Sequence, residues 1–441
     1  QGGSSSRSHS QGPPSEGRGR QPAMWTWLLA AFVFLPAAGV AACLALDMLK
    51  RPDEKAKDGK TDKDVPSAAP MPKGFRFLDE DDAADVKEQA KASAEPPECE
   101  ILECKGDEEA PAIAFLVGNP GCPLSYTTFG RCMQEELAEL HEGKKATVYI
   151  VGLANFVSRR EYLGPPLGVR EEMDRVARAL EKIAPRHRKA GLMLVSHSCT
   201  CWMLLQSLLE ALRHGTGCLA GARIPLVLFA APYLEFDKDQ TLQYVLRLFL
   251  WRWFTPYLIG MLTKLYLGLS WEAKAWIMKD VMHAKTEEDV QILLATCGRQ
   301  RHHLRGMLGL ASDFFRVIAK GTITSGFFLM EELLKEDLRP VIAAFYCENG
   351  DDWASLSHMR RLGSLFMGAA GYGGPGCELG CLGDVEHNFI QDPEQSRTAA
   401  KAIAPTLDEA WKRAAAIRPL PASEEEVEEA VRRRAADVEV L

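Results

Sequence analysis

The sequence predicts an α/β fold with a mostly parallel, doubly wound sheet. Short, β-rich apolar runs recur between about residues 111 and 417, and amphipathic segments separate them, as expected for a buried parallel sheet with helices on both faces. Each run also ends in a turn signal, and ligands in such folds bind at the carboxyl ends of the strands. The predicted strands are 112–117, 146–151, 192–195, 225–230 and 341–346. The predicted helices are 125–140, 169–186, 199–213 and 394–416.

An insertion interrupts this alternation. Residues 235–338 show helical patterns but no convincing strand, which predicts a helical hydrophobic cap between two parts of the core, 99–234 and 339–417. The first half of the cap is dense in Leu and aromatic residues with interspersed Arg and Lys, as in helices that lie at a lipid interface. A lid packed over a pocket, or a plain core helix, would carry the same pattern. The residues expected to contact a membrane are Trp251, Trp253, Phe254, Tyr257 and Trp271.

The N-terminal part of the chain predicts a membrane element followed by a linker. Residues 24–49 include an apolar run of about 22 residues, roughly 33 Å as a helix, which is enough to cross a bilayer. We expect a retained transmembrane signal anchor, with a cleaved signal peptide as the alternative. Residues 1–22 are predicted to be disordered, 50–98 to form a charged flexible linker, and 418–441 to be a charged tail.

Composition excludes several classes of protein. Of 441 residues, 46% are hydrophobic and 25% charged, which are values typical of a globular chain. The 52 Lys and Arg against 60 Asp and Glu give a net charge of −8, and no stretch is strongly basic, so a nucleic-acid partner is not expected. Twelve cysteines without zinc-site spacing predict scattered free thiols, with Cys99–Cys104 and Cys377–Cys381 bridges as the alternative.

A candidate nucleophile follows the third predicted strand. Ser198 stands between that strand and a helix, where a tight turn exposes a hydroxyl and the helix start supplies the Cys199 N–H to a developing oxyanion. The usual pattern is Gly-x-Ser-x-Gly, but Ser196 and Thr200 occupy the glycine positions. We expect β-branched Thr200 to crowd the neighbouring strand, so that Thr200→Gly would raise activity. Alternation along the chain should turn the His197 side chain away from Ser198.

A second oxyanion donor is expected where the first strand ends. Gly118 and Gly121 permit a tight turn there, and Asn119 can offer its N–H at the mouth of the site, whereas Pro120 has none to offer. Asn119 and Cys199 are therefore the predicted pair of donors. A purely structural Gly-Asn-Pro-Gly turn is the competing interpretation.

The remaining catalytic groups come from the end of the chain. His387 lies just before the last predicted helix and is the candidate general base, while Asp351 or Asp352, after strand 341–346, would orient it. Ser, Asp, His is the chain order of α/β-hydrolases. The two aspartates have no third ligand nearby, so no metal site is expected. His302 and His303 lie in a basic helical stretch and are predicted to be solvated.

With these residues in view, the chain resembles the lipid droplet-associated hydrolase family of the α/β-hydrolase superfamily, over about residues 110–417. The matching features are the Gly-Asn-Pro-Gly turn followed by Tyr126 and Phe129, His197-Ser198, Phe345-Tyr346, Asp351-x-Trp353 and Glu386-His387-x-Phe389. The resemblance selects Asp351 over Asp352. It implies an α/β-hydrolase fold, a serine esterase or lipase-like activity, a hydrophobic lid, association with lipid droplets or the endoplasmic reticulum, and no metal or organic cofactor.

Two departures from the family pattern are the missing glycines beside Ser198 and the N-terminal anchor. The expected function is hydrolysis of a lipid ester, of the sterol ester or acylglycerol type, by Ser198, His387 and Asp351 at a membrane or lipid-droplet surface. The alternative is a membrane-tethered lipid-surface or scaffolding protein that keeps the hydrolase fold and has lost turnover because Thr200 distorts the turn.

Overall fold

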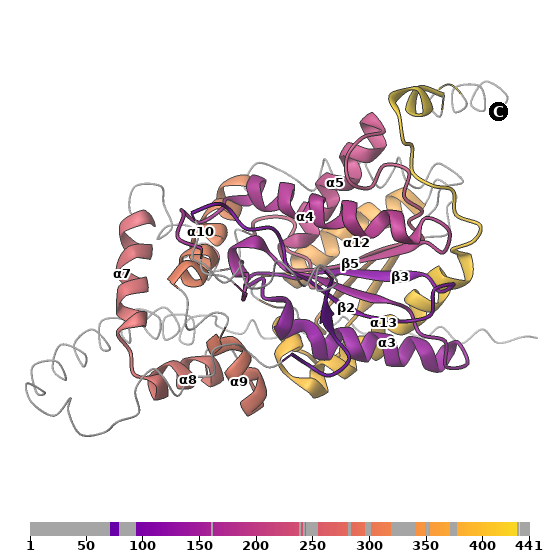
Figure 1. The fold of residues 1–441 in the computed structure, drawn as a ribbon. Coiled ribbons are helices and arrows are strands. Elements are labelled where there is room, and N and C mark those ends of the chain that lie inside the picture. The colour runs from indigo at the N-terminus through magenta and orange to yellow at the C-terminus, as the bar shows by residue number, and fades with distance from the viewer. Residues whose placement is uncertain are drawn as a thin grey trace, which may run out of the picture. The chain divides into compact units, whose positions relative to one another are not determined.

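A single twisted sheet organises the computed structural model (Figure 1). The structure describes residues 71–78, 94–159, 162–237, 240, 243, 255–280, 284–295, 301–318, 341–348, 351, 353–370, 377–429 and 432. Within them the sheet has eight strands in the order β1-β2-β4-β3-β5-β6-β7-β8. The strands are β1 (Arg76–Phe77), β2 (Ile101–Cys104), β3 (Ala112–Leu116), β4 (Val148–Val151), β5 (Leu192–His197), β6 (Leu226–Ala230), β7 (Val341–Tyr346) and β8 (Cys377–Cys381).

Strands β3 to β8 run parallel, while β2 is antiparallel to both β1 and β4. Every residue of β3, AIAFL, is buried, because helices cover both faces of the sheet and leave no solvated side for polar residues. The five predicted strands are confirmed, each end within two residues of its predicted place. β4 lies on one side of β3 and β5 on the other, so the strand order reverses at β3. In open α/β sheets, ligands bind outside the carboxyl ends of the strands at such a point.

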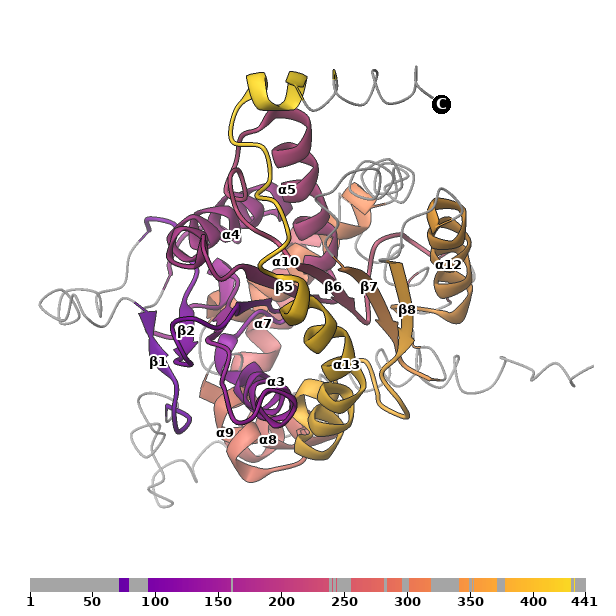
Figure 2. The same ribbon diagram turned by 90° about the vertical axis from the view of Figure 1, so that its right-hand side faces the viewer.

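Helices flank the sheet in two layers (Figure 2). One face carries α3 (Thr127–Leu140) and α13 (Pro393–Arg413), and the other carries α4 (Val169–Ile183), α5 (Thr200–His214) and α12 (Leu356–Ala370). The four predicted helices correspond to α3, α4, α5 and α13, with short 3-10 turns at Pro123–Tyr126 and Ala184–His187 extending the first two. Local chemistry fixes one boundary clearly: Asp392 caps the first amides of α13, and Pro393 follows at its first position.

The edge of the sheet contains strands that were not predicted. β1 lies inside the segment 50–98 that was predicted to be a flexible linker, and that prediction is wrong for residues 71–78. Phe75, Phe77 and Leu78 are buried in the core, and Arg76 forms an ion pair with Glu103 of β2 at 2.7 Å. A two-residue strand is too short to show a period of two in sequence. The predicted disordered segment 1–22 and anchor 24–49 lie outside the described residues.

The insertion is helical, as predicted, and its described residues contain no strand. Its described helices are α7 (Thr255–Leu267), α8 (Trp271–Asp280), α9 (Glu287–Leu293) and α10 (Arg301–Ile318). These helices gather beyond one end of the sheet (Figure 1). No helix in the described part of the chain combines the length and apolar character that a membrane span requires.

The residues expected to contact a membrane differ in their surroundings. Tyr257 is 82% exposed on α7, whereas Trp271 at the start of α8 is partly buried against the core. Trp251, Trp253 and Phe254 lie outside the described residues. The structure adds two exposed large hydrophobic side chains, Met261 on α7 and Trp276 on α8.

The free-thiol interpretation of the cysteines is confirmed where the structure describes them. Cys99 and Cys104 are buried and unbridged, and Cys381 is a free, exposed thiol. Burial raises the pKa of Cys99 and Cys104, so both remain neutral at pH 7.

Candidate active site

Ser198 occupies a strained turn between β5 and α5. Its φ of 58° lies in the left-handed region, which non-glycine residues rarely adopt. Three backbone hydrogen bonds hold it there: its N–H donates to Ala230, and its carbonyl accepts from Cys201 and Tyr233, at 3.1, 3.2 and 3.1 Å. The turn sets the hydroxyl at the carboxyl end of the sheet.

Thr200 does not crowd the neighbouring strand, and that expectation is wrong. Its hydroxyl oxygen lies 3.0 Å from the carbonyl of Leu116, at the end of β3, and 2.9 Å from the carbonyl of His197. The side chain is fully buried, and its hydroxyl supplies a hydrogen-bond donor at this strand end that glycine does not have. The sequence-based reason for expecting a weakened turn is thereby removed.

The structure brings Ser198, His387 and Asp351 together in one series of contacts, with His387 in the middle. His387 Nε2 is 2.9 Å from the Ser198 hydroxyl oxygen, and His387 Nδ1 is 2.9 Å from Asp351 Oδ2. Ser198 follows β5, Asp351 follows β7 and His387 follows β8. The parallel strands share one carboxyl edge, which explains why the three residues meet. Asp352, the other aspartate considered from the sequence, lies outside the described residues.

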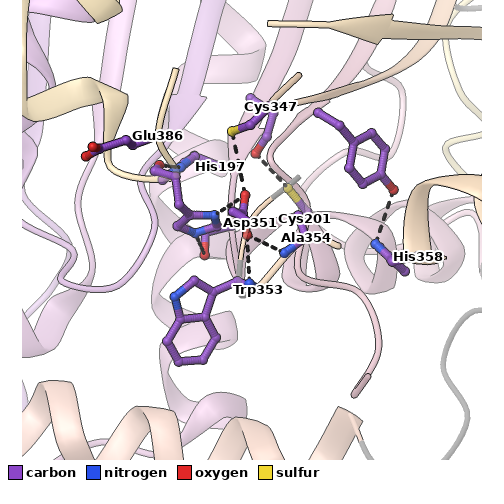
Figure 3. Close-up of polar contacts among 12 residues, drawn as sticks. His197, Cys201, Cys347, Asp351, Trp353, Ala354, His358 and Glu386 are labelled. Atoms are coloured by element: carbon purple, nitrogen blue, oxygen red, sulfur yellow. Dashed lines mark hydrogen bonds and ion pairs between the residues drawn. The ribbon is translucent and has the colours of Figure 1, made fainter. Parts of the chain in front are cut away.

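The Asp351 carboxylate is held in a polar cradle (Figure 3). Its Oδ1 accepts the N–H groups of Trp353 at 2.7 Å and Ala354 at 2.5 Å, and the Cys347 thiol lies 3.6 Å from Oδ2. Burial favours the neutral acid, but His387 and the two amides outweigh it and lower the pKa of Asp351 to about 2. The carboxylate is therefore ionised at pH 7.

This charge fixes the proton positions in the line of three residues. An ionised Asp351 only accepts hydrogen bonds, so His387 Nδ1 carries a proton and donates it. In neutral His387 the lone pair is then on Nε2, facing the Ser198 hydroxyl, which is the arrangement that general-base catalysis requires.

The two predicted oxyanion donors belong to segments that meet next to Ser198. Cys199 precedes the first residue of α5, where the amide groups of a helix start have no partner within the helix. The backbone amide of Asn119 lies close enough to the Cys199 sulfur to oppose the effect of burial, which raises the pKa of that thiol to about 12. The Asn119 side chain donates to the carbonyl of Met307 in α10 at 3.0 Å, so the cap contacts this turn directly.

His197 has a more specific environment than the sequence indicated. Its side chain points away from the Ser198 hydroxyl, as alternation predicted, and bonds Tyr126 and the His387 carbonyl instead, so it is packed into the site rather than exposed. Its ring is 2% exposed and lies 5.3 Å from the Phe389 ring and 5.1 Å from the His387 ring. A histidine next to the nucleophile was visible in the sequence, whereas its partners, which are distant in the chain, were not.

The prediction that His302 and His303 are solvated is wrong. Their exposed fractions are 5% and 0%, because α10 packs against the turn Ala154–Phe156. His303 stacks on Phe156 and its Nε2 lies 2.9 Å from the Val157 carbonyl. A basic stretch gave no sign that this face of the helix meets the core. Among the described residues there is also no group of three or more side chains that could hold a metal ion.

Strand order, the turn at Ser198 and the position of the three residues after β5, β7 and β8 define the α/β-hydrolase class. The model of one protein family, the lipid-droplet associated hydrolases, matches residues 109–390. The chain belongs to this family, and it is a hydrolase of the α/β-hydrolase type, as the sequence resemblance predicted. No curated protein matches the sequence.

Solved structures with some similarity have low sequence identity. A haloalkane dehalogenase from Bradyrhizobium elkani is 14% identical, with 70% of this chain and 95% of that chain covered and a TM-score of 0.43. A mutant haloalkane dehalogenase from Agrobacterium tumefaciens is 15% identical, with 78% and 99% covered and a TM-score of 0.44. The thioesterase domain from the curacin biosynthetic pathway is 12% identical, with 70% and 95% covered and a TM-score of 0.41.

Replacing Thr200 tests the role of its hydroxyl. We expect Thr200→Gly to lower stability by about 2 kcal/mol, through loss of a buried hydrogen bond and of helix propensity, without raising activity. Thr200→Ser keeps the hydroxyl and should stay close to the parent chain. Thermal unfolding and ester turnover of both variants decide the matter, and a more active Thr200→Gly chain would show that the threonine does impede the turn.

The buried histidines of α10 predict a dependence of stability on pH. Burial lowers the pKa of His302 to about 4 and that of His303 further below its usual value. The unfolded chain therefore binds protons first as the pH falls below about 6.5, and stability is lost progressively toward pH 4. The double variant His302→Gln/His303→Gln should lose less stability between pH 7.5 and 5 in urea unfolding. An equal loss in both proteins would contradict this assignment.

Proposed function

We propose that the chain is a serine hydrolase that cleaves carboxylic esters of lipids. The observation that carries this proposal is the line of two 2.9 Å contacts from the Ser198 hydroxyl through His387 to the ionised Asp351. A serine hydroxyl is a weak nucleophile until a positioned base removes its proton, and this arrangement supplies the base and fixes its tautomer.

In the proposed reaction, Ser198 Oγ attacks the ester carbonyl while His387 Nε2 takes the hydroxyl proton. The N–H groups of Asn119 and Cys199 stabilise the negative charge that develops on the carbonyl oxygen. His387 then gives the proton to the departing alcohol, leaving an acyl group on Ser198. A water molecule, deprotonated by His387, then attacks the acyl carbonyl; the bond to Ser198 Oγ breaks, the acid leaves, and His387 returns the proton to Oγ. Asp351 stays ionised throughout and stabilises the imidazolium.

The surroundings of the site favour an apolar substrate. Trp353 lies two residues after Asp351, and its ring centroid is 6.4 Å from that of His387. The same ring packs with Tyr233 and with Phe315 of α10, at centroid distances of 5.7 and 6.2 Å. Aromatic side chains from both the core and the cap therefore pack together next to His387. We propose sterol esters or acylglycerols as the substrate class, met at the surface of lipid droplets or the endoplasmic reticulum.

The cap provides a surface for such contact. Tyr257, Met261 and Trp276, on α7 and α8, are 82%, 51% and 55% exposed. Aromatic side chains are favoured at membrane–water interfaces, and burying each large side chain fully in an apolar phase contributes roughly 1.5–3 kcal/mol. The proposed lipid contact therefore rests on these three side chains, because Trp271 is already partly buried against the core.

Labelling with a fluorophosphonate probe tests the proposed nucleophile without the natural substrate. The probe should modify Ser198, and Ser198→Ala should remove the modification. His387→Ala and Asp351→Asn should each reduce ester turnover by roughly three or more powers of ten, and the double variant should be little worse because the residues act as a unit.

Ser207 is a matched control for this experiment, because it is also buried and lies on α5, the helix that follows Ser198. Ser207→Ala should label like the parent chain. Undiminished labelling of a folded Ser198→Ala chain would contradict the assignment of the nucleophile, and a folded parent chain that neither reacts with the probe nor cleaves esters would favour the scaffolding alternative.

Flotation with phospholipid-coated triglyceride emulsions tests the proposed lipid surface. A chain beginning at residue 71 lacks the predicted anchor but retains β1, and we expect it to float with the emulsion. Replacing Tyr257, Met261 and Trp276 together by Ser should reduce its bound fraction at least tenfold, since their apolar burial is lost.

The matched control replaces Leu140 and Leu163, which are 51% and 61% exposed and lie outside the cap. This control should float like the unmodified shortened chain. Equal flotation of the triple variant would contradict a role for α7 and α8 in lipid binding.

A further inference from the structure

A buried tyrosine and histidine connect the two sides of the candidate active site. Tyr126 ends the 3-10 turn after the oxyanion segment, and His197 ends β5 immediately before Ser198. Both side chains are 2% exposed, and their rings meet edge to face with centroids 5.8 Å apart. Neither has a part in the proton transfers described above.

Three successive hydrogen bonds run through this pair. The Gly118 N–H donates to the Tyr126 hydroxyl oxygen at 2.9 Å. The same oxygen lies 3.2 Å from His197 Nδ1, and His197 Nε2 lies 3.0 Å from the backbone carbonyl of His387. The chain of contacts thus begins at the residue before Asn119 and ends at the residue that carries the proposed base.

The donors and acceptors allow a consistent placement of protons. A carbonyl oxygen only accepts, so His197 Nε2 must carry a proton to bond His387. Burial lowers the pKa of His197 to about 3, so the ring is neutral at pH 7 and its Nδ1 is an acceptor. The Tyr126 hydroxyl then donates to Nδ1 while its oxygen accepts from Gly118.

Close packing around Gly118 leaves little freedom for this arrangement. A Cβ at Gly118 would lie 2.8 Å from His197 Nδ1, 3.0 Å from the Ser198 Cβ and 3.1 Å from the Tyr126 hydroxyl oxygen. The backbone of the oxyanion turn therefore touches the pair directly. Because the Gly118 N–H also bonds the Tyr126 hydroxyl, the position of this ring bears directly on the backbone that carries the Asn119 N–H.

We propose that Tyr126 and His197 are positioning residues that hold the Asn119 amide and the His387 imidazole in register on opposite sides of the reacting carbonyl. This inference rests on the proposed serine hydrolase function. His197 would link the two sides, because its Nδ1 bonds Tyr126 on the oxyanion side and its Nε2 bonds the backbone of His387.

The expected kinetic effect is on the chemical step. Displacing a catalytic group by about 1 Å costs up to roughly a hundredfold in rate, whereas substrate contacts elsewhere are unaffected. For hydrolysis of a soluble p-nitrophenyl ester by the full chain, Tyr126→Phe should lower kcat ten- to a hundredfold and change KM less than threefold. The rate of labelling of Ser198 by a fluorophosphonate should fall by a similar factor.

Variants of His197 separate positioning from simple packing. Gln can place an N–H near the position of Nε2 and so keep the bond to the His387 carbonyl, whereas Leu fills space without a donor. His197→Gln should therefore retain at least tenfold more kcat than His197→Leu, at comparable thermal stability.

Tyr149 offers a matched control, because it is also 2% exposed and its hydroxyl bonds His187 at 2.9 Å with the same edge-to-face ring contact. Tyr149→Phe should lower thermal stability about as much as Tyr126→Phe while leaving kcat within twofold of the parent. A parent chain without Ser198 labelling would refute the proposed function. Normal labelling of the parent with an equal rate in Tyr126→Phe, or equal kcat in the His197→Gln and His197→Leu chains, would refute the positioning role alone.

Discussion

The conformation of one residue, Ser198, is the constraint on which the site depends. A left-handed backbone angle is unfavourable for serine, and it persists because Ala230, Cys201 and Tyr233 each bond its backbone. Cys201 is local to the turn, whereas Ala230 and Tyr233 come from the end of β6 and the segment after it, so packing against the neighbouring strand helps to fix the turn. Thr200 extends the same principle, since its hydroxyl ties the start of α5 to the ends of β3 and β5.

Around this turn, one buried titratable group is charged and another is neutral. The Asp351 carboxylate is ionised and bonded by two amides and by His387. His197, whose ring lies 5.1 Å from the His387 ring, is neutral because burial lowers its pKa. Both ring nitrogens of His197 are bonded to other groups, so His387 is the histidine of the pair placed to exchange a proton with Ser198. The cap enters the same environment through Met307, which accepts a bond from the Asn119 side chain.

Much of this arrangement could be predicted from the sequence because it depends on local patterns. Five central strands are continuous apolar runs, and the residues after them fall at a common edge in any parallel sheet, which is why Ser198 and Asp351 could be proposed together. His387 could be added because it lies just before the last predicted helix and completes the chain order Ser, Asp, His. The edge strands β1 and β8 could not be predicted, since they are short or carry no alternation. The burial of His302 and His303 and the bonds of Thr200 depend on which element packs against each side chain, and such distant contacts leave no local pattern.

The crystal structure of the full chain after reaction with a fluorophosphonate tests the central claim most directly. The account predicts a phosphorus–oxygen bond to Ser198, with the phosphonyl oxygen within hydrogen-bond distance of the Asn119 and Cys199 amides and His387 still bonded to Asp351. A phosphonyl oxygen directed away from both amides, or a phosphonate carried by another residue, would contradict it.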